Sequence, residues 1–214
     1  MNKKAFAILA LAATSLSMTA LASEDEVIHS YSYSLTDINE IYIEGGIGTM
    51  EVLHTDGNEL RVELELEGTR RYFVFNKRSV EDIEIEDRVR GDRLSLRLNE
   101  DDLDHVKAHW RVEMPSVART HIELGVGQIT AEFVDTELEV EVGVGAGDIT
   151  LARSYVGRVE ASAGVGSAVL QGANDTVSKR AMVSEESYGF GNGQHRVELS
   201  VGVGEMKVRL DDET

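Results

Sequence analysis

The stretch Val201-Gly202-Val203-Gly204, near the C-terminus, decides how the chain is interpreted. Each related copy follows one alternating run of apolar residues and precedes another. The copies are Gly45-Gly46-Ile47-Gly48, Gly125-Val126-Gly127, Gly143-Val144-Gly145-Ala146-Gly147 and Gly164-Val165-Gly166. A glycine motif that recurs at nearly fixed spacing indicates a repeat architecture, in which similar units stack on one another.

The apolar positions change phase at each copy. Before Gly204 they are odd, so Val201 and Val203 are both expected in the core, and after it they are even, beginning with Met206. Strand side chains alternate between two faces, so this one-residue slip requires a bend or bulge at the glycine. Glycine suits such a corner because it adopts backbone angles closed to other residues and lets neighbouring strands approach closely.

The spacing of the corners predicts a sixth copy. From Gly127 onward the corner glycines are 20, 19 and 38 residues apart. Because 38 is twice 19, a further copy that has lost its corner glycine is expected near Ser184. A unit of about 19–20 residues holds two short strands and two turns, and it buries its apolar face only when stacked. The predicted fold is all-β: a β-solenoid, similar to a single-stranded β-helix. Its expected structural corners are Gly48, Gly127, Gly147, Gly166, Ser184 and Gly204.

The rest of the chain divides by composition. Residues 1–22 have the pattern of a signal peptide, in which Lys3 and Lys4 precede an apolar run and cleavage is expected after Ala22. Residues 23–39 are interpreted as a polar leader. Residues 40–115 are expected to form the first repeat unit, antiparallel-like strands and a cap, and residues 116–210 the solenoid. An acidic tail, 211–214, is expected to cap the other end, since open sheet edges invite pairing.

Charge restricts the class of partner. Without Lys3 and Lys4 the chain has 19 basic and 39 acidic residues, a net charge of −20. This charge opposes binding to nucleic acid or anionic lipid. The chain has no cysteine, so neither a disulfide nor a cysteine-linked lipid anchor is expected. The apolar N-terminal run is too short for a good membrane span, so we expect no stable membrane insertion after cleavage and a periplasmic or secreted location.

Several features together resemble a known family. They are Leu94-Ser95-Leu96, the run from Trp110 to Pro115, the run from Ile122 to Ala131, and the repeated Val-Glu units that end in Gly-x-Gly. Over about residues 40–210 the chain resembles bacterial β-strand-repeat domains of the adhesin type. These include the head domain of adhesin-like auto-transporters and the C-terminal domain of LiaF-like cell-wall-stress proteins. The resemblance implies a β-solenoid, an envelope location and no established catalytic site.

No motif predicts a cofactor site or a calcium site. The glycines are followed by strand patterns, whereas a dinucleotide loop needs G-x-G-x-x-G before a helix. The stretch from Gly143 to Asp148 is only distantly similar to calcium-binding nonapeptides, which need tandem copies. The acidic turn with Asp101, Asp102 and Asp104 is interpreted as solvated, with calcium binding left open.

Histidine and tryptophan also have structural interpretations. His105 and His109 have the spacing of a helical zinc pair, but the surrounding alternation predicts a strand, on which they would lie about 13 Å apart. Trp110 is expected to pack in the core or a cap. We therefore expect no catalytic, cofactor or metal residues.

Three functions remain open at this level. The first is a non-catalytic envelope protein that presents a sheet surface to a protein or glycan. The second is a structural or envelope-stress accessory protein that acts by self-association. The third, which has least support, is a polysaccharide-cleaving enzyme on a β-helix, because no catalytic constellation stands out.

Overall fold

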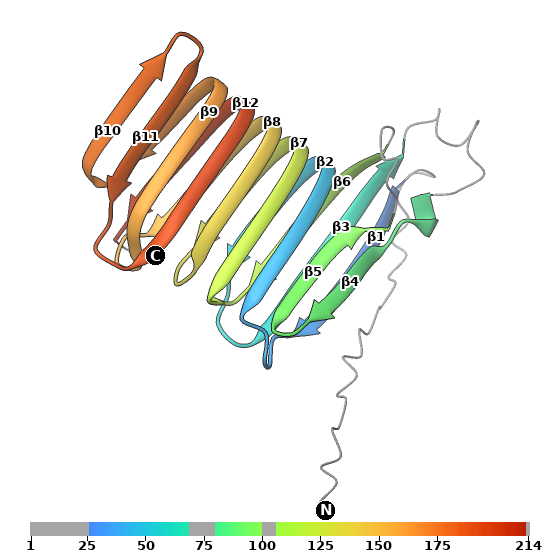
Figure 1. Ribbon diagram of the computed structural model, residues 1–214. Coiled ribbons are helices and arrows are strands. Elements are labelled where there is room, and N and C mark those ends of the chain that lie inside the picture. Colours follow the sequence, from blue (N-terminus) through green and yellow to red (C-terminus); the bar gives the residue numbers. More distant parts are fainter. Residues whose placement is uncertain (1–25, 69–79, 100–105, 213–214) are drawn as a thin grey trace, which may run out of the picture.

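The computed structural model describes residues 26–68, 80–99 and 106–212 and shows an all-β protein. Its strands form one open mixed sheet, ordered β1-β3-β6-β2-β7-β8-β12-β9-β11-β10, with β4 and β5 continuing from β2 (Figure 1). The strands are β1 (Glu26–Ser34), β2 (Glu40–His54), β3 (Glu59–Gly68), β4 (Ile85–Arg90), β5 (Arg93–Leu98), β6 (Val106–Met114), β7 (Arg119–Phe133), β8 (Glu137–Ala152), β9 (Val156–Gln171), β10 (Asn174–Ala181), β11 (Ser184–Phe190) and β12 (His195–Asp211). A 3-10 turn, η1 (Val80–Asp82), precedes β4.

Five long parallel strands, β2, β7, β8, β12 and β9, carry the glycine motif and bend at it (Figure 1). We call the halves before the bend the first layer and the halves after it the second layer. In β7, Ile122 and Leu124 are buried before the bend, and Ile129 and Ala131 after it. The alternation predicted from the sequence therefore places apolar side chains of both layers in one core.

β5 and β6 form a further bent unit whose two halves are separated by residues 99–105. β5 pairs in parallel with the first half of β2, from Glu40 to Glu44, and β6 pairs with its second half, from Gly48 to His54. The sequence pattern of residues 40–115 predicts a first repeat unit, antiparallel-like strands and a cap. The antiparallel pairs are β1 with β3, β3 with β6 and β4 with β5, which extend the two layers at this end.

The bends are built on one glycine in each long strand. Gly48, Gly127, Gly145, Gly204 and Gly166 lie side by side in register and have φ between 139° and 149°. This backbone region is open essentially to glycine alone. A Cβ atom on Gly127, Gly145, Gly166 or Gly204 would lie 1.7 Å from the carbonyl oxygen of the adjacent corner glycine. Glycine is thus required both by the backbone angle and by the close approach of the strands.

The prediction that Gly147 is a corner is wrong by two residues. Gly145 holds the corner position, and Gly147 lies opposite Met206 and Ile129 on the core side. A Cβ atom on Gly147 would be 2.5 Å from the sulfur of Met206. Gly147 therefore leaves room for the long Met206 side chain of the neighbouring strand.

The strand order departs from a solenoid of successive coils. β12 lies between β8 and β9, in parallel with both, and the sheet is not closed. The unit expected around Ser184 does not exist. Ser184 begins β11, which forms an antiparallel hairpin with β10 after a turn in which Met182 has φ 53°. The Met206 side chain of β12 packs in the space left by Gly147 on β8.

Different elements close the two ends of the core. At one end β1 occupies residues that were expected to be a polar leader, and Tyr33 is 1% exposed there. The Tyr31 hydroxyl accepts a hydrogen bond from the Ile85 amide of β4, 3.2 Å away, which links the two layers. At the other end the β10–β11 hairpin replaces the expected acidic tail as the cap. Buried Ser187 there donates to the carbonyl of Ala168 at 2.7 Å.

The core prediction for Trp110 is confirmed, since its side chain is buried on β6. The predicted signal peptide, residues 1–22, lies outside the described residues. Among the described residues, no helix is long and apolar enough to cross a membrane.

Candidate binding surface

The outer face of the first layer, which we call the first-layer face, is lined with carboxylates at matching positions of adjacent strands. Glu44, Glu123 and Glu141 are register neighbours on β2, β7 and β8. A second row lies two residues closer to the strand starts and contains Glu139, Glu198 and Glu160, on β8, β12 and β9. These strands lie about 4.8 Å apart, so each row places like charges next to one another. Folding alone does not favour such rows, which makes the face a candidate for binding.

His121 joins the two carboxylate rows. Its Nδ1 lies 2.9 Å from Glu139 and its Nε2 lies 2.9 Å from Glu123. Its ring stacks on Tyr42, with centroids 4.9 Å apart. Partial burial acts to lower the pKa of His121, but hydrogen bonds and charge interactions with Glu123 and Glu139 outweigh it and raise that pKa. Protonated His121 therefore neutralises part of the negative charge at the centre of the face.

Glu44 and Glu141 have no ion pair among the contacts of the described residues, whereas Glu160 is paired with Arg158 at 3.2 Å and Glu198 with Arg196. A surface depression of about 180 Å³ lies among the carboxylates of β8, β12 and β9. Its lining residues are Glu139, Val140, Glu141, Glu160, Ser162, Glu198, Leu199 and Ser200. A cationic group placed here would meet several carboxylates and two serine hydroxyls.

The same face becomes basic at its β4–β5 end. Arg88, Arg90, Arg93 and Arg97 border a depression of about 240 Å³. Arg97 pairs with Glu86 at 2.6 Å, and Arg93 pairs with Glu40 of β2. Four arginines therefore gather at the β4–β5 end of the first-layer face, whereas Arg119, Arg196 and Arg158 on β7, β12 and β9 are each paired with a neighbouring glutamate.

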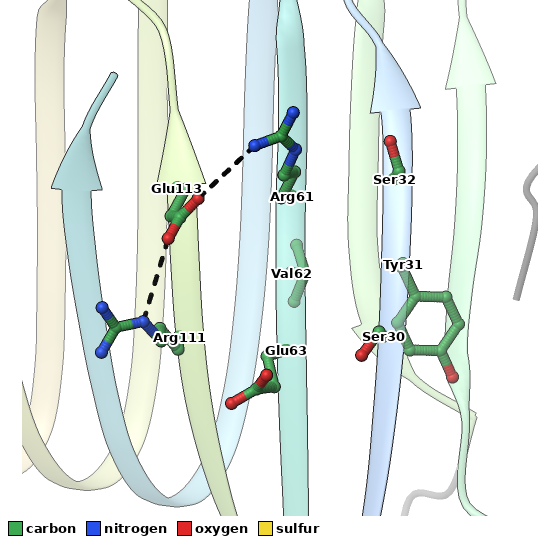
Figure 2. A pocket seen from close by; sticks show the side chains of 8 residues that line it. All are labelled: Ser30, Tyr31, Ser32, Arg61, Val62, Glu63, Arg111 and Glu113. Atoms are coloured by element: carbon green, nitrogen blue, oxygen red, sulfur yellow. Dashed lines mark ion pairs between the residues drawn. The ribbon is translucent and has the colours of Figure 1, made fainter. Parts of the chain in front are cut away.

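The outer face of the second layer, which we call the second-layer face, has mixed charge. A depression of about 320 Å³ lies over β1, β3 and β6 (Figure 2). It is lined by Ser30, Tyr31, Ser32, Arg61, Val62, Glu63, Arg111 and Glu113. Figure 2 shows Glu113 between Arg61 and Arg111, each 4.0 Å away.

The polar groups of this depression are largely matched within the protein. Arg61 also pairs with Glu59 at 2.7 Å, and Arg111 with Glu51 at 2.9 Å. The Ser32 hydroxyl donates a hydrogen bond to Glu59. Surface ion pairs of this kind contribute little to stability, about 0–1 kcal/mol each.

The middle residues of the glycine motifs form an exposed row, which corrects the expectation that they fill the core. Val126, Val144, Val165 and Val203 are 44–47% exposed, and Ile47 is half-buried. The five are register neighbours across β2, β7, β8, β12 and β9, and we call this row the aliphatic ridge. They project outward because the bend at the following glycine places them at the apex of the strand. Val201 is buried, as expected.

The remaining sequence candidates do not converge on a chemical site. His109 contacts Thr49 at 2.8 Å and lies 3.7 Å from Glu67. Asp148 lies on the outer side of β8, opposite Lys207. Asp101, Asp102, Asp104 and His105 fall outside the described residues. In the part of the chain that the structure describes, no three His, Asp or Glu side chains are grouped so that they could hold a metal ion.

Sequence reasoning missed the carboxylate rows and the ridge. The signal for the rows was present, because glutamates alternate with apolar residues at fixed distances before each corner glycine, as Glu123 and Glu141 do. Recognising them as rows required the correct register at Gly145. The ridge had no comparable signal, since its valines continue the buried alternation of each strand.

Comparisons with known proteins give structural likenesses at low identity. No family model matches the chain, and no curated protein matches its sequence. A crystal structure described as a "putative cell adhesion protein" from Clostridium sporogenes ATCC 15579 is 13% identical, with a TM-score of 0.49, and the match covers 87% of this chain and 100% of that one. A "putative adhesin" from Parabacteroides distasonis ATCC 8503 is 11% identical, with a TM-score of 0.29 and coverages of 84% and 96%. With TM-scores below 0.5, the function of this chain must be argued from its own residues.

Proposed function

We propose that the protein is an exported, non-catalytic envelope protein of the adhesin type that binds a protein or glycan through its first-layer face. The observation that carries this proposal is the pair of in-register carboxylate rows. Side chains on paired strands project from fixed backbone positions, so the spacing of the carboxylates is set before a partner binds. Export is proposed from the pattern of residues 1–22.

The proposal is tested by reversing charge on one face at a time. The full chain is immobilised, and binding of purified envelope proteins and polysaccharides is measured by surface plasmon resonance. The variant Glu139→Lys/Glu198→Lys should lose binding by at least tenfold. The matched variant Glu63→Lys/Glu132→Lys, with the same charge change on the second-layer face, should keep it. Equal loss in both variants would contradict a role for the first-layer face.

Catalysis is tested with the same reagents. Turnover of a cell-wall or polysaccharide substrate that disappears in Glu139→Gln or Glu198→Gln would overturn the non-catalytic part of the proposal.

Self-association is a second candidate because the sheet ends in an open strand. All eight residues of β10 are exposed, and β10 pairs only with β11. Unpaired edges favour pairing with another chain, although Lys179, Arg180 and the register shift near Asp175 oppose it. Analytical ultracentrifugation tests this candidate. A monomer at every concentration up to about millimolar would exclude it.

A further inference from the structure

The aliphatic ridge is an unusual feature for an exposed strand position. Strand propensity alone would be met equally well by threonine, yet all five bent strands place isoleucine or valine there. The row continues onto the β10–β11 turn, where Val183 is 59% exposed and Met182 99% exposed. The Val183 carbonyl accepts a hydrogen bond from Gly166 at 2.8 Å, which holds this turn beside the ridge. An exposed apolar row of this length is typical of an interaction site.

A strip of bare backbone borders the ridge on its first-layer side. Gly125, Gly143, Gly202 and Gly164 directly precede the ridge valines, and all four are exposed. A Cβ on Gly143 would lie 2.5 Å from the Gly125 carbonyl oxygen. The strands therefore pack too closely here to accept side chains, and a partner reaches the backbone directly.

Carboxylates line the far side of the bare strip. Glu123 and Glu141 lie two residues before Gly125 and Gly143, and Glu44 is their register neighbour on β2. On the opposite side of the ridge the corresponding strands carry uncharged Thr49, Gln128 and Ala146. The nearest outward positions on that side are thus uncharged over β2, β7 and β8, and the carboxylates two residues farther have basic neighbours: Glu51 pairs with Arg111, and Asp148 lies opposite Lys207.

We propose that the ridge, the bare strip and this carboxylate row together bind an amphipathic α-helix that has one aliphatic face and adjacent lysine or arginine residues. Strands about 4.8 Å apart place five ridge residues over roughly 19 Å. Four helical turns span about 22 Å, so successive turns of a helix lying across the strands follow successive ridge residues. An extended peptide repeats every 6.6–6.8 Å and loses register within two strands.

The negative charge of this surface favours a cationic helix over a second copy of the chain or an anionic lipid surface. A second copy of the chain would bring its own carboxylate row and a net charge of −18 to the contact, and like charges repel. An anionic lipid surface is disfavoured for the same reason. A cationic helix places its basic side chains over Glu44, Glu123 and Glu141 while its aliphatic side chains cover the ridge.

The test uses a fluorescein-labelled 18-residue peptide of leucine and lysine, arranged so that the leucines lie on one helical face. Its binding to the full chain is measured by fluorescence anisotropy. We expect Glu123→Gln/Glu141→Gln and Val144→Ser/Val203→Ser each to weaken binding about tenfold, and added salt to weaken it further. The charge control is Glu63→Gln/Glu132→Gln on the second-layer face, and the apolar control is Val89→Ser, at a site 42% exposed on β4. Both controls should bind like the original chain.

Three results would overturn the proposal. One is equal loss in the charge control, which would mean that only net charge matters. Another is equal binding of a peptide with the same residues scrambled so that no helical face is apolar. The third is a dimer of the unmodified chain that Val144→Ser dissociates, which would make a second copy the occupant. This proposal shares Glu44, Glu123 and Glu141 with the first-layer face of the proposed function, but the ridge belongs to this proposal alone. Loss of peptide binding in Val144→Ser/Val203→Ser, with peptide binding kept in Glu139→Lys/Glu198→Lys, therefore distinguishes the two proposals.

Discussion

Replacing Gly204 with alanine tests whether the corner glycines hold the fold together. The substitution imposes two separate costs. An L-residue at φ 143° is strained by about 1–3 kcal/mol. The new Cβ would also lie 1.7 Å from the Gly145 carbonyl oxygen, where real contacts do not fall below 3.0 Å, so these two atoms must move apart.

That separation weakens the backbone hydrogen bonds between β12 and β8, each with a net contribution of about 0.5–1.5 kcal/mol. Alanine offsets about 0.4–1 kcal/mol by restricting the unfolded chain. The expected loss in the free energy of unfolding is therefore about 3–5 kcal/mol. For a chain of this length it corresponds to a melting temperature roughly 6–20 °C lower. Gly204→Val should cost at least as much.

Substitutions at two other glycines separate the cost of backbone strain from the cost of the close approach between strands. Gly57 has φ 114° but open space around its Cβ position, so Gly57→Ala has the strain alone, about 1–3 kcal/mol. Gly202 has an ordinary φ, but a Cβ there would be 2.6 Å from the Gly143 carbonyl oxygen, so Gly202→Ala has the close approach alone. Urea unfolding of the three variants gives the comparison. If Gly204→Ala were no less stable than Gly57→Ala, the close approach of the corners would not matter.

Three further predictions concern single positions. Gly147→Ala should cost about 1–3 kcal/mol by crowding Met206, and Gly147→Ala/Met206→Ala should show a coupling energy in a double-mutant cycle; simple additivity would refute the contact. The folded state raises the pKa of His121 above its unfolded value of 6.5, so its stabilising contribution is complete below pH 6.5 and is lost as pH rises through the folded pKa. The difference in unfolding free energy between the original chain and His121→Gln should therefore fall with rising pH, and His121 should titrate above 6.5 by NMR; a constant difference would refute this. Trp110, the chain's single tryptophan, is 2% exposed, so its emission should be blue-shifted and resist acrylamide quenching until the chain unfolds; ready quenching of the folded chain would contradict its burial.

The glycine motif shows how much of the fold the alternation of apolar residues along one strand can predict. Alternation before and after each motif predicts two strand halves with opposite phase, and Ile122 and Ile129 are buried on either side of the bend as that pattern requires. The corner position within Gly143–Gly147 was misplaced because three glycines satisfy the same pattern. Only pairing with Gly127 and Gly204 shows that Gly145 is the corner.

The carboxylate rows were visible in the sequence only as separate glutamates on separate strands. Glu139, Glu198 and Glu160 become one row because β12 lies between β8 and β9. Sequence order would have placed β12 beyond the hairpin, away from β8. The first-layer face as a binding surface thus depends on a strand order that the repeat spacing did not predict.

The sequence by itself determined that this protein is built from β-strands that bend at glycine, because alternation and the phase change are local consequences of strand geometry. The tertiary structure decided which strands are neighbours and which apolar residues remain exposed. The choice of neighbouring strands involves contacts between residues far apart in the chain, such as that of Met206 with Gly147. The valines of the ridge are exposed because at the apex of a bend neither layer covers them, and periodicity along one strand carries no information about that apex.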